Sequence, residues 1–549
     1  MMTAMGSSRR LGSCALAAAS VLLATTATAP GVTQALAVTG APVFGLTHDL
    51  GTAGGEPSLQ DDGQGHVYVT TPAGILSSFG GSGVLLSRSD DGGTTFKAGQ
   101  TVGGAYGGED SDILADATGK NVYAADLAVS HANIVKSTDF GATWNSPAAG
   151  IGGLINDREW LTSIGPNLFL TYHDLANNAP EIWGSTDGGS TWLPLGFAHT
   201  GQILAPTDPA FADNKCNTLV SKPVADAAGT LYVLSNTSTA AENAQVGCAA
   251  PPPALERFYL MVSKDGGNTF TSSLASDLTT GTTGNPKPGS WGHTFNQLAI
   301  DAGGNLYIDA SGTLNGSLPL QNYLLVSKDG GKTWSKPIAT HPSPNGQLFP
   351  SIAVGGAGQV AVGYYQGTKP SHTASGNNFQ FVVDQTFDAL DATPTFTRTQ
   401  LPPLKGTTPH PDGICTDGIF CGTPLSAGGN RNLADFESMA VDATGHLEVI
   451  IPADCDKCAG NTENWFYKQT SGPLMPPGAT NGNGTGNQTW VAGARTQPPP
   501  APVAPSPSPV AAPNTSRAPA PPAPASGALL LGSLLLAVAA FFTLRRRAA

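Results

Sequence analysis

The middle of the chain repeats one pattern of apolar and polar positions seven times. The pattern reads approximately apolar-x-apolar-Asp-x-x-Gly-x-apolar-Tyr-apolar, and its clearest copy covers residues 298–308. Two short apolar alternations on either side of a Gly-containing turn predict two strands joined as a hairpin. The copies begin at Pro57, Ser111, Trp160, Lys222, Gln297, Pro350 and Ser438. We therefore expect an all-β fold of seven repeated units, with six units as the alternative.

A second pattern, Ser-x-Asp-x-Gly-x-Thr-Trp/Phe, follows the hairpin in five of these units. An Asp carboxylate can accept hydrogen bonds from the amides of its own turn, and Gly can adopt a positive φ. Each copy follows a β-type run, so we expect a hairpin turn with a structural role. We call these segments the Ser-x-Asp turns, and their aspartates are Asp91, Asp139, Asp187, Asp265 and Asp329.

The five turns resemble the Asp-box (BNR) repeats of sialidase-like β-propellers. The resemblance implies a β-propeller, in which such turns join the third and fourth strands of a blade on the face away from the ligand site. Such turns occur in enzymes and in non-enzymes, so the resemblance assigns blades and no chemistry. The seventh repeat has no fourth strand after Tyr467, whereas residues 43–46 form a lone strand before the first repeat. We therefore expect the N-terminal strand to close the ring, which removes both free sheet edges.

The two ends of the chain differ in composition from the repeats. An arginine pair, an apolar run and small residues at the start predict an export signal, by the general or the twin-arginine route. Near the other end, a Pro/Ala/Gly-rich stretch precedes an apolar run just long enough to span a bilayer, and arginines follow it. The predicted parts are a signal peptide at 1–37, the propeller at 41–472, a stalk at 473–526, a transmembrane helix at 527–544 and a basic cytoplasmic tail at 545–549.

The charge balance narrows the choice of partners. The chain has 39 acidic and 26 basic residues, and every acidic residue lies in the predicted propeller. Nucleic acids and anionic lipid surfaces need a basic face, so both are disfavoured as partners of the propeller. A neutral glycan, a surface protein or a cation is easier to accommodate. We expect a monomer without a cofactor, with Ca²⁺ as the open alternative.

Six cysteines of the predicted propeller fall in three pairs that are close in sequence. In an exported domain such pairs predict disulfides, although proximity is the only basis for the pairing. The Cys-x-x-Cys pair at 455 and 458 leaves a redox or metal pair open as the alternative. The predicted pairs are Cys216 with Cys248, Cys415 with Cys421, and Cys455 with Cys458.

The resemblance places ligand sites at the channel mouth, in loops that lead into innermost strands or join second and third strands. Such loops contain Glu56, Asp110 and Arg431, and the densest cluster is Asp157 to Trp160. This cluster suits stacking on a sugar and fixing its hydroxyls, and the alternative is an ion pair between blades. Two further carboxylates flank Phe436, where they could share a proton or bind Ca²⁺. The predicted ligand-binding residues are Asp157, Arg158, Glu159, Trp160, His173, Asp435 and Glu437.

Catalytic residues cannot be transferred from the resemblance. Sialidases use three arginines, a Tyr-Glu pair, an Asp and a Phe/Tyr-Arg-Ile-Pro motif, and this motif is missing from the sequence. Of the five arginines between residues 41 and 472, we expect only Arg158, Arg257 and Arg431 to lie near the mouth. We expect an exported, membrane-tethered surface protein whose mouth binds a glycan or a surface partner without cleaving it. An exo-acting, sialidase-type glycoside hydrolase is the alternative.

Overall fold

The computed structural model describes residues 40–476, apart from gaps at 74–82, 103–107, 109, 129–130, 153–155, 176–178, 227, 247–253, 281–287, 293–294, 419–420, 422–423, 425 and 459–461. The predicted signal peptide, transmembrane helix, basic tail and nearly all of the stalk lie outside the described residues. Within the described part, no helix is long and apolar enough to cross a membrane.

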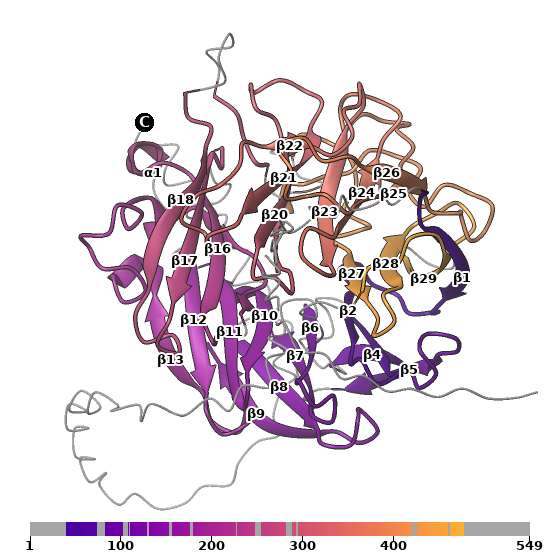
Figure 1. The fold of residues 1–549 in the computed structure, drawn as a ribbon, viewed down its shortest axis with the longest axis horizontal. Coiled ribbons are helices and arrows are strands. Elements are labelled where there is room, and N and C mark those ends of the chain that lie inside the picture. Colours follow the sequence, from indigo (N-terminus) through magenta and orange to yellow (C-terminus); the bar gives the residue numbers. More distant parts are fainter. Residues whose placement is uncertain are drawn as a thin grey trace, which may run out of the picture. The chain divides into compact units, whose positions relative to one another are not determined.

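The described chain forms a seven-bladed β-propeller, which confirms the predicted fold class. Inner strands such as β2, β10, β23 and β27 face the centre of the ring, and β1 and β13 lie at its rim (Figure 1). Blade 1 consists of β2 (Ser58–Asp61), β3 (Val67–Thr71), β4 (Val84–Ser89) and β5 (Lys97–Val102). Blade 2 consists of β6 (Ser111–Ala115), β7 (Val122–Ala128), β8 (His131–Ser137) and β9 (Asn145–Ile151). Blade 3 consists of β10 (Asn156–Ile164), β11 (Asn167–Asp174), β12 (Ala179–Ser185) and β13 (Leu193–Phe197).

The remaining blades follow the same order. Blade 4 divides its inner strand into β14 (Thr218–Val220) and β15 (Val224–Ala225), followed by β16 (Leu231–Thr237), β17 (Arg257–Ser263) and β18 (Thr271–Asp277). Blade 5 consists of β19 (Gln297–Ile300), β20 (Leu306–Gly312), β21 (Gln321–Ser327) and β22 (Ile338–Ala339). Blade 6 consists of β23 (Gln347–Val354), β24 (Val360–Gln366), β25 (Gln380–Thr386) and β26 (Thr397–Gln400). Short helices, η2 (Ala198–Thr200), η3 (Asp213–Lys215) and α1 (Ala240–Val246), lie in the loops around blade 4.

Blade 7 is closed by the N-terminal strand, as the sequence predicts. It contains β27 (Ser438–Val441), β28 (Leu447–Ala453) and β29 (Glu463–Ser471), and its fourth strand is β1 (Val43–Asp49). β1 pairs antiparallel with β29, with Thr47 opposite Tyr467. The pairing satisfies the backbone groups of both strands, so the ring has no open edge at this point.

Apolar side chains on both faces of each sheet hold the blades together. All seven residues of β7 are buried, because the strand lies between the neighbouring sheets. Trp291 is fully buried and stacks on Phe258 at a centroid distance of 4.8 Å. Burial of one such large side chain contributes roughly 1.5–3 kcal/mol. Packing between blades therefore supplies most of the driving force for closing the ring.

The Ser-x-Asp turns all have the same local geometry. In the last copy, the Asp329 carboxylate accepts from the Thr333 amide at 2.9 Å, from the Thr333 hydroxyl at 2.6 Å and from the Ser327 hydroxyl at 2.9 Å. Gly331 has φ +85°, and a Cβ there would lie 2.1 Å from Leu260 of the preceding blade. This Gly is therefore required by the backbone conformation and by the contact between blades. The predicted structural role of the turn accounts for each of its defining positions.

Blade 6 has a looser version of the same turn. Asp388 accepts from the Thr386 hydroxyl at 2.5 Å, from the Thr395 amide at 2.9 Å and from the Thr395 hydroxyl at 2.6 Å. The Asp and the second Thr are seven residues apart here, against four residues in the Ser-x-Asp turns. The sequence predicts only a degenerate turn in this blade, because the longer spacing hides the motif.

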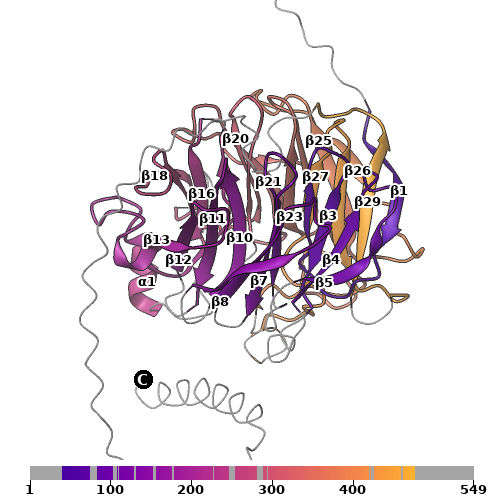
Figure 2. The same ribbon diagram turned by 90° about the horizontal axis from the view of Figure 1, so that it is seen from below.

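Both ends of the described chain lie on one face of the propeller. The turn between β27 and β28 contains Gly445, whose carbonyl accepts a hydrogen bond from the Met475 amide at 2.9 Å. Met475 is fully buried, and a Cβ on Gly472 would lie 2.4 Å from the Ala41 carbonyl. In an antiparallel blade, the first hairpin turn and the Ser-x-Asp turn lie at the same end of the strands. The loops of the predicted mouth lie at the opposite end of the strands, which run between the two faces in the side view of Figure 2.

Candidate functional site

The channel mouth is a charged cluster to which four blades contribute. Arg158 Nη1 lies 3.7 Å from Glu56 Oε2 and 3.8 Å from Asp110 Oδ1. Arg431 Nη2 lies 3.7 Å from Glu56 Oε1, and Arg431 also pairs with Asp435. These residues precede β2, β6 and β27 or belong to β10, so radial convergence of the inner strands brings them together. We call this group, together with Asp157 and Glu159, the mouth cluster.

Arg158 is a buried residue of this cluster. Its side chain is 1% exposed, and its guanidinium lies 4.1 Å from the Trp160 ring and 3.9 Å from the Phe436 ring. It also donates a hydrogen bond to the Ser111 carbonyl at 2.9 Å. The sequence left two roles open for these residues, stacking on a sugar and pairing between blades. The contacts of Arg158 are those of an ion pair between blades 1, 2, 3 and 7.

A backbone irregularity places the Arg158 side chain in the cluster. The pairing of β10 with β11 shifts in register between Asp157 and Trp160, and Arg158 has φ +53°. A left-handed residue at a β-bulge turns its side chain away from the alternation of a regular strand. Glu56 and Phe349 also adopt a positive φ just before a Pro-Ser pair of another inner strand. A residue with a positive φ thus recurs at the entry to the inner strand, and the side chain at this position differs from blade to blade.

Below the arginine, aromatic side chains meet across the channel. Trp160, Phe295 and Phe436 form one buried cluster, with Leu219 packed against it. The Trp160 and Phe436 ring centroids are 5.1 Å apart, and those of Phe295 and Phe436 are 6.1 Å apart. These residues belong to blades 3, 5 and 7, which are not neighbours in the ring. Their contact therefore crosses the central axis, and it forms an apolar floor under the mouth cluster.

Carboxylates outnumber arginines in the mouth cluster. Burial, and then the charges of Asp110 and Asp435, raise the pKa of Asp157 to about 8. Burial and the neighbouring Asp110 raise the pKa values of Glu56 and Glu159 well above their ordinary range. Burial opposes ionisation of Asp110 too, but the Arg158 charge and a hydrogen bond with Glu56 hold its pKa below the usual value. The mouth thus holds carboxyls with raised and with lowered pKa values side by side.

The structure places the other predicted ligand residues at different depths. Asp157 and Asp435 are half-buried. Arg431, the partner of Asp435, was not a predicted ligand residue, and its side chain is 32% exposed. His173 is buried on β11, opposite Asp157 in the strand register. Glu437 is 2% exposed and lines a cavity of the channel. The expected meeting of Asp435 with Glu437 is wrong, because both residues precede β27 and strand alternation does not apply to them.

Several members of the mouth cluster were not among the predicted ligand residues. Glu56, Asp110 and Arg431 stand in the loops that the sequence singles out, but no single loop contains more than a part of the cluster. Phe295 and Phe436 lie directly before inner strands. A search for large or charged residues in the two positions before each repeat would have found most of them.

The arginine arrangement differs from a sialidase triad. All five arginines between residues 41 and 472 are described, and each has a carboxylate partner. Only Arg158 and Arg431 share one, Glu56. The others pair locally: Arg88 with Asp90, Arg257 with Asp213 and Asp277, and Arg398 with Asp384. The mouth therefore brings two arginines together and not three.

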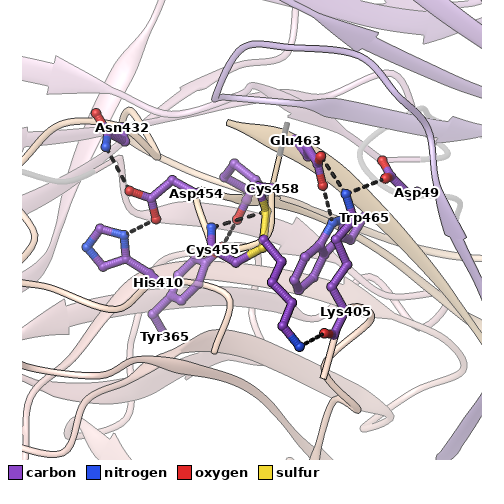
Figure 3. Close-up of a disulfide and its surroundings, with 12 residues drawn as sticks. Asp49, Tyr365, Lys405, His410, Asn432, Asp454, Cys455, Cys458, Glu463 and Trp465 are labelled. Atoms are coloured by element: carbon purple, nitrogen blue, oxygen red, sulfur yellow. Dashed lines mark hydrogen bonds and ion pairs between the residues drawn. A yellow bond between two sulfur atoms is a disulfide. The ribbon is translucent and has the colours of Figure 1, made fainter. Parts of the chain in front are cut away.

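A disulfide hairpin braces the loop that leads into blade 7. Cys455 and Cys458 are bonded, and Figure 3 shows them between two polar contacts. On one side, His410 Nδ1 lies 2.5 Å from Asp454 Oδ1, and on the other Lys405 Nζ lies 2.5 Å from Glu463 Oε1. His410 and Lys405 belong to the loop that supplies Arg431 and Phe436. The hairpin therefore helps to fix the mouth cluster in place.

The disulfide predictions are confirmed where the residues are described. Cys415 and Cys421 are bonded, as are Cys455 and Cys458. Cys216 is also disulfide-bonded, and its predicted partner Cys248 lies outside the described residues. Cys455, Cys458 and Glu463 have ligand atoms within 4.8 Å of one another. With both sulfurs in a disulfide, this group does not suit a metal ion, which needs thiolates.

The sequence matches no protein-family model and no curated protein. Several solved structures resemble the fold. They include YCF48 bound to a D1 peptide, with 9% identity, 80% of this chain and 100% of that chain covered, and a TM-score of 0.42. A mutant of NanB sialidase from Streptococcus pneumoniae has 12% identity, 75% and 68% coverage, and a TM-score of 0.38. The α-L-arabinofuranosidase Arb93A from Fusarium graminearum, in complex with an iminosugar inhibitor, has 15% identity, 57% and 92% coverage, and a TM-score of 0.34. At these values the likeness concerns the fold alone.

Proposed function

We propose that the protein is an exported, membrane-tethered propeller that binds a glycan or a surface partner at its channel mouth without cleaving it. The observation that carries the proposal is the mouth cluster itself. Half-buried Asp157, Asp435 and Arg431 stand beside the buried Arg158, above an aromatic floor. Convergent polar groups over an apolar base are typical of ligand sites.

The charges of the cluster favour a neutral or cationic ligand. Both arginines are already paired with carboxylates, and three carboxyls of the cluster, including the shared partner Glu56, have raised pKa values. An anionic sugar would meet repulsion from Asp110, whose lowered pKa favours the charged form, and would find both arginines already paired. Hydroxyls or an amine would form hydrogen bonds without adding negative charge. A neutral oligosaccharide or an amino sugar is therefore the preferred ligand class.

The position of the chain ends supports the tether. Met475 leaves the propeller on the face opposite the mouth cluster. A stalk that continues from this point to a membrane anchor would leave the mouth free to face outward. Deleting residues 527–549 should then release the protein into the medium, and finding the intact full-length protein free in the medium would contradict the tether.

Binding is tested by calorimetry with three defined oligosaccharides: a neutral β-glucan, an amino-sugar oligomer and sialyllactose. We expect binding of the first or second class, at least a tenfold loss in Arg431→Ala, and no change in Arg257→Ala. Arg257 is the matched control, because its side chain is 24% exposed and it also pairs with two carboxylates. Binding that prefers sialyllactose, or an equal loss in both variants, would refute the proposal.

The hydrolase alternative is favoured by one observation in the mouth. Asp157 has a pKa raised to about 8, and Asp110 beside it has a lowered one. Carboxyls whose surroundings separate their pKa values are typical of acid–base pairs. Release of reducing sugar by the purified protein, lost in Asp157→Asn but retained in Arg257→Ala, would establish the enzyme. Binding without any such release would support the proposal above.

A further inference from the structure

Beneath the aromatic floor, the central channel contains a small polar cavity. Its volume is about 50 Å³, and strands β2, β19, β23 and β27 and the segment before β15 contribute to its wall. The polar side chains of this wall are those of Gln60, Lys222, Gln297, Ser351, Glu437 and Ser438. A polar cavity larger than about 15 Å³ can hold water or a small ion. The cavity is separate from the mouth cluster, because residues of blades 3, 5 and 7 meet between them.

Glu437 is the unusual group of this wall. Its side chain is buried, and neither carboxylate oxygen has a hydrogen-bond partner. Burial, and then the charge of Asp309, raise its pKa well above the usual range. A buried carboxylate without a partner costs several kcal/mol, so native structures normally supply a proton, water or a cation.

Asp309 is a second buried carboxylate, and its charge acts on Glu437. It is fully buried, its Oδ1 accepts from Asn322 Nδ2 at 2.7 Å, and its Oδ2 has no partner. Asp309 lies directly opposite Gln297 in the pairing of β19 with β20, and Gln297 lines the cavity. Opposite residues in an antiparallel pair point to the same face, so Asp309 is directed toward the cavity side of the sheet.

Blade 5 has further oxygen atoms on the strands that carry Asp309 and its partner Asn322. Ser311 Oγ and Asn322 Oδ1 are also buried without partners, and the two residues are opposite one another in the pairing of β20 with β21. Lys222 is the one cation in the wall of the cavity, and its ammonium is already committed to Asp112 Oδ1 at 2.8 Å and to the Ile113 carbonyl at 3.2 Å. Carboxylate, amide and hydroxyl oxygens are the ligands preferred by hard cations such as Ca²⁺.

We propose that the channel cavity binds one hard cation of the calcium class between Glu437 and Asp309. A divalent ion would neutralise both carboxylates and give their free oxygens a partner. Water together with a proton on one carboxyl is the alternative, and the titration described below distinguishes it from a bound ion. The ion would link blade 5 to blade 7 across the channel, below the mouth cluster and independently of any ligand bound there.

The test uses the full-length chain after treatment with a chelator. Ca²⁺ is titrated by calorimetry, with Mg²⁺ and Na⁺ as comparison ions, and the melting temperature is recorded in each. We expect one Ca²⁺ per chain and a rise in Tm of ~1–3 °C, because an ion bound only by the folded state stabilises it. Absence of both the heat and the Tm shift would show that the cavity holds water only, and would overturn the proposal.

Variants locate the ion. Glu437→Gln and Asp309→Asn should each weaken Ca²⁺ binding at least tenfold, and should fold, since each replaces a buried carboxylate by a neutral group of the same shape. Asp391→Asn is the control, because Asp391 is exposed on blade 6. Unchanged binding in Glu437→Gln would refute the site. Loss in Asp157→Asn, with Glu437→Gln unaffected, would place the ion at the mouth and equally refute it.

Discussion

The propeller uses aspartate and glutamate in two opposite ways on its two faces. In the Ser-x-Asp turns the carboxylates are exposed, and hydrogen bonds from the following Thr and the preceding Ser hold the pKa of Asp91, Asp139 and Asp329 at about 2. In the mouth cluster the carboxyls are buried or half-buried beside one another, and the pKa of Asp157 rises to about 8. Carboxylates therefore stabilise turns at one end of the blades, whereas at the other end neighbouring carboxylates repel one another.

The difference lies in where the hydrogen-bond donors come from. Within a Ser-x-Asp turn, eight consecutive residues supply every donor to the carboxylate. At the mouth, the donors and the charges come from blades 1, 2, 3 and 7, and there are too few cations for the carboxylates. Under the proposed function, a bound ligand supplies the missing partners and offsets this cost in stability.

The largest expected effect is the loss of the arginine that joins the mouth cluster. Arg158→Ala leaves the buried Asp110 without its ion-pair partner, leaves Glu56 with Arg431 alone, and removes the contacts with Trp160 and Phe436. Breaking a buried ion pair in this way costs roughly 3–5 kcal/mol. We expect a loss of this size in urea unfolding of the purified protein.

Arg88→Ala is the matched control for this loss. Its partner Asp90 is 36% exposed, and such pairs contribute roughly 0–1 kcal/mol. Equal small losses in both variants would show that Arg158 is held in place by its surroundings and is not a clamp. Ligand binding should then be weaker in Arg158→Ala than in the parent chain, and Arg158 would be assigned to the ligand site.

The same contrast explains what the sequence could predict. The repeats, the ring closure by β1 and the Ser-x-Asp turns follow from local patterns, since each needs only a few consecutive residues or two strand signals. The sequence also located the loops of the mouth. It could not show that Arg158 would be sandwiched by Phe436 of blade 7, because that contact depends on radial convergence of residues nearly three hundred positions apart.

The sequence also could not show how deep in the channel Asp435 and Glu437 lie. Asp435 and Glu437 are two residues apart, but Asp435 pairs with Arg431 at the mouth whereas Glu437 lines the cavity below the aromatic floor. Ala434 has φ +61°, so the chain approaches β27 with an irregular backbone. Side chains alternate between the two faces only within a strand, and these residues precede β27. The expectation that Asp435 and Glu437 lie on the same side is therefore wrong.

A smaller effect is expected from Asp157→Asn, and its sign depends on pH. The folded-state pKa of about 8 lies above the ordinary value near 4, so the folded protein binds this proton more tightly than the unfolded chain does. Stability from this group is complete below pH ~4 and is lost as the pH rises toward 8. Asp157→Asn should therefore stabilise the protein at pH 8, by about 1–2 kcal/mol, because neighbouring carboxyls can take up the proton instead.

The measurement is the free energy of unfolding of both proteins between pH 5 and pH 8.5. The fall in stability with rising pH should be shallower in Asp157→Asn than in the parent chain. Parallel curves would mean that Asp157 is already ionised at pH 5, and the picture of shared protons in the mouth cluster would be wrong.

The smallest effect is expected at the opposite face, where Asp329→Ala removes one carboxylate from a Ser-x-Asp turn. The turn would lose hydrogen bonds from the Thr333 amide and hydroxyl and from the Ser327 hydroxyl. Water replaces them readily at an exposed site, so we expect a cost of only about 1 kcal/mol at pH 7. The folded pKa of about 2 lies below the unfolded value, so this contribution is present above pH ~4 and is lost as the pH falls toward 2. Urea unfolding at pH 7 and pH 3 should therefore show a smaller gap between Asp329→Ala and the parent chain at the lower pH, with Asp391→Ala indistinguishable from the parent at both. A gap that widens on acidification would show that the carboxylate does not stabilise the turn through its charge, and the contrast between the two faces would then rest on burial alone.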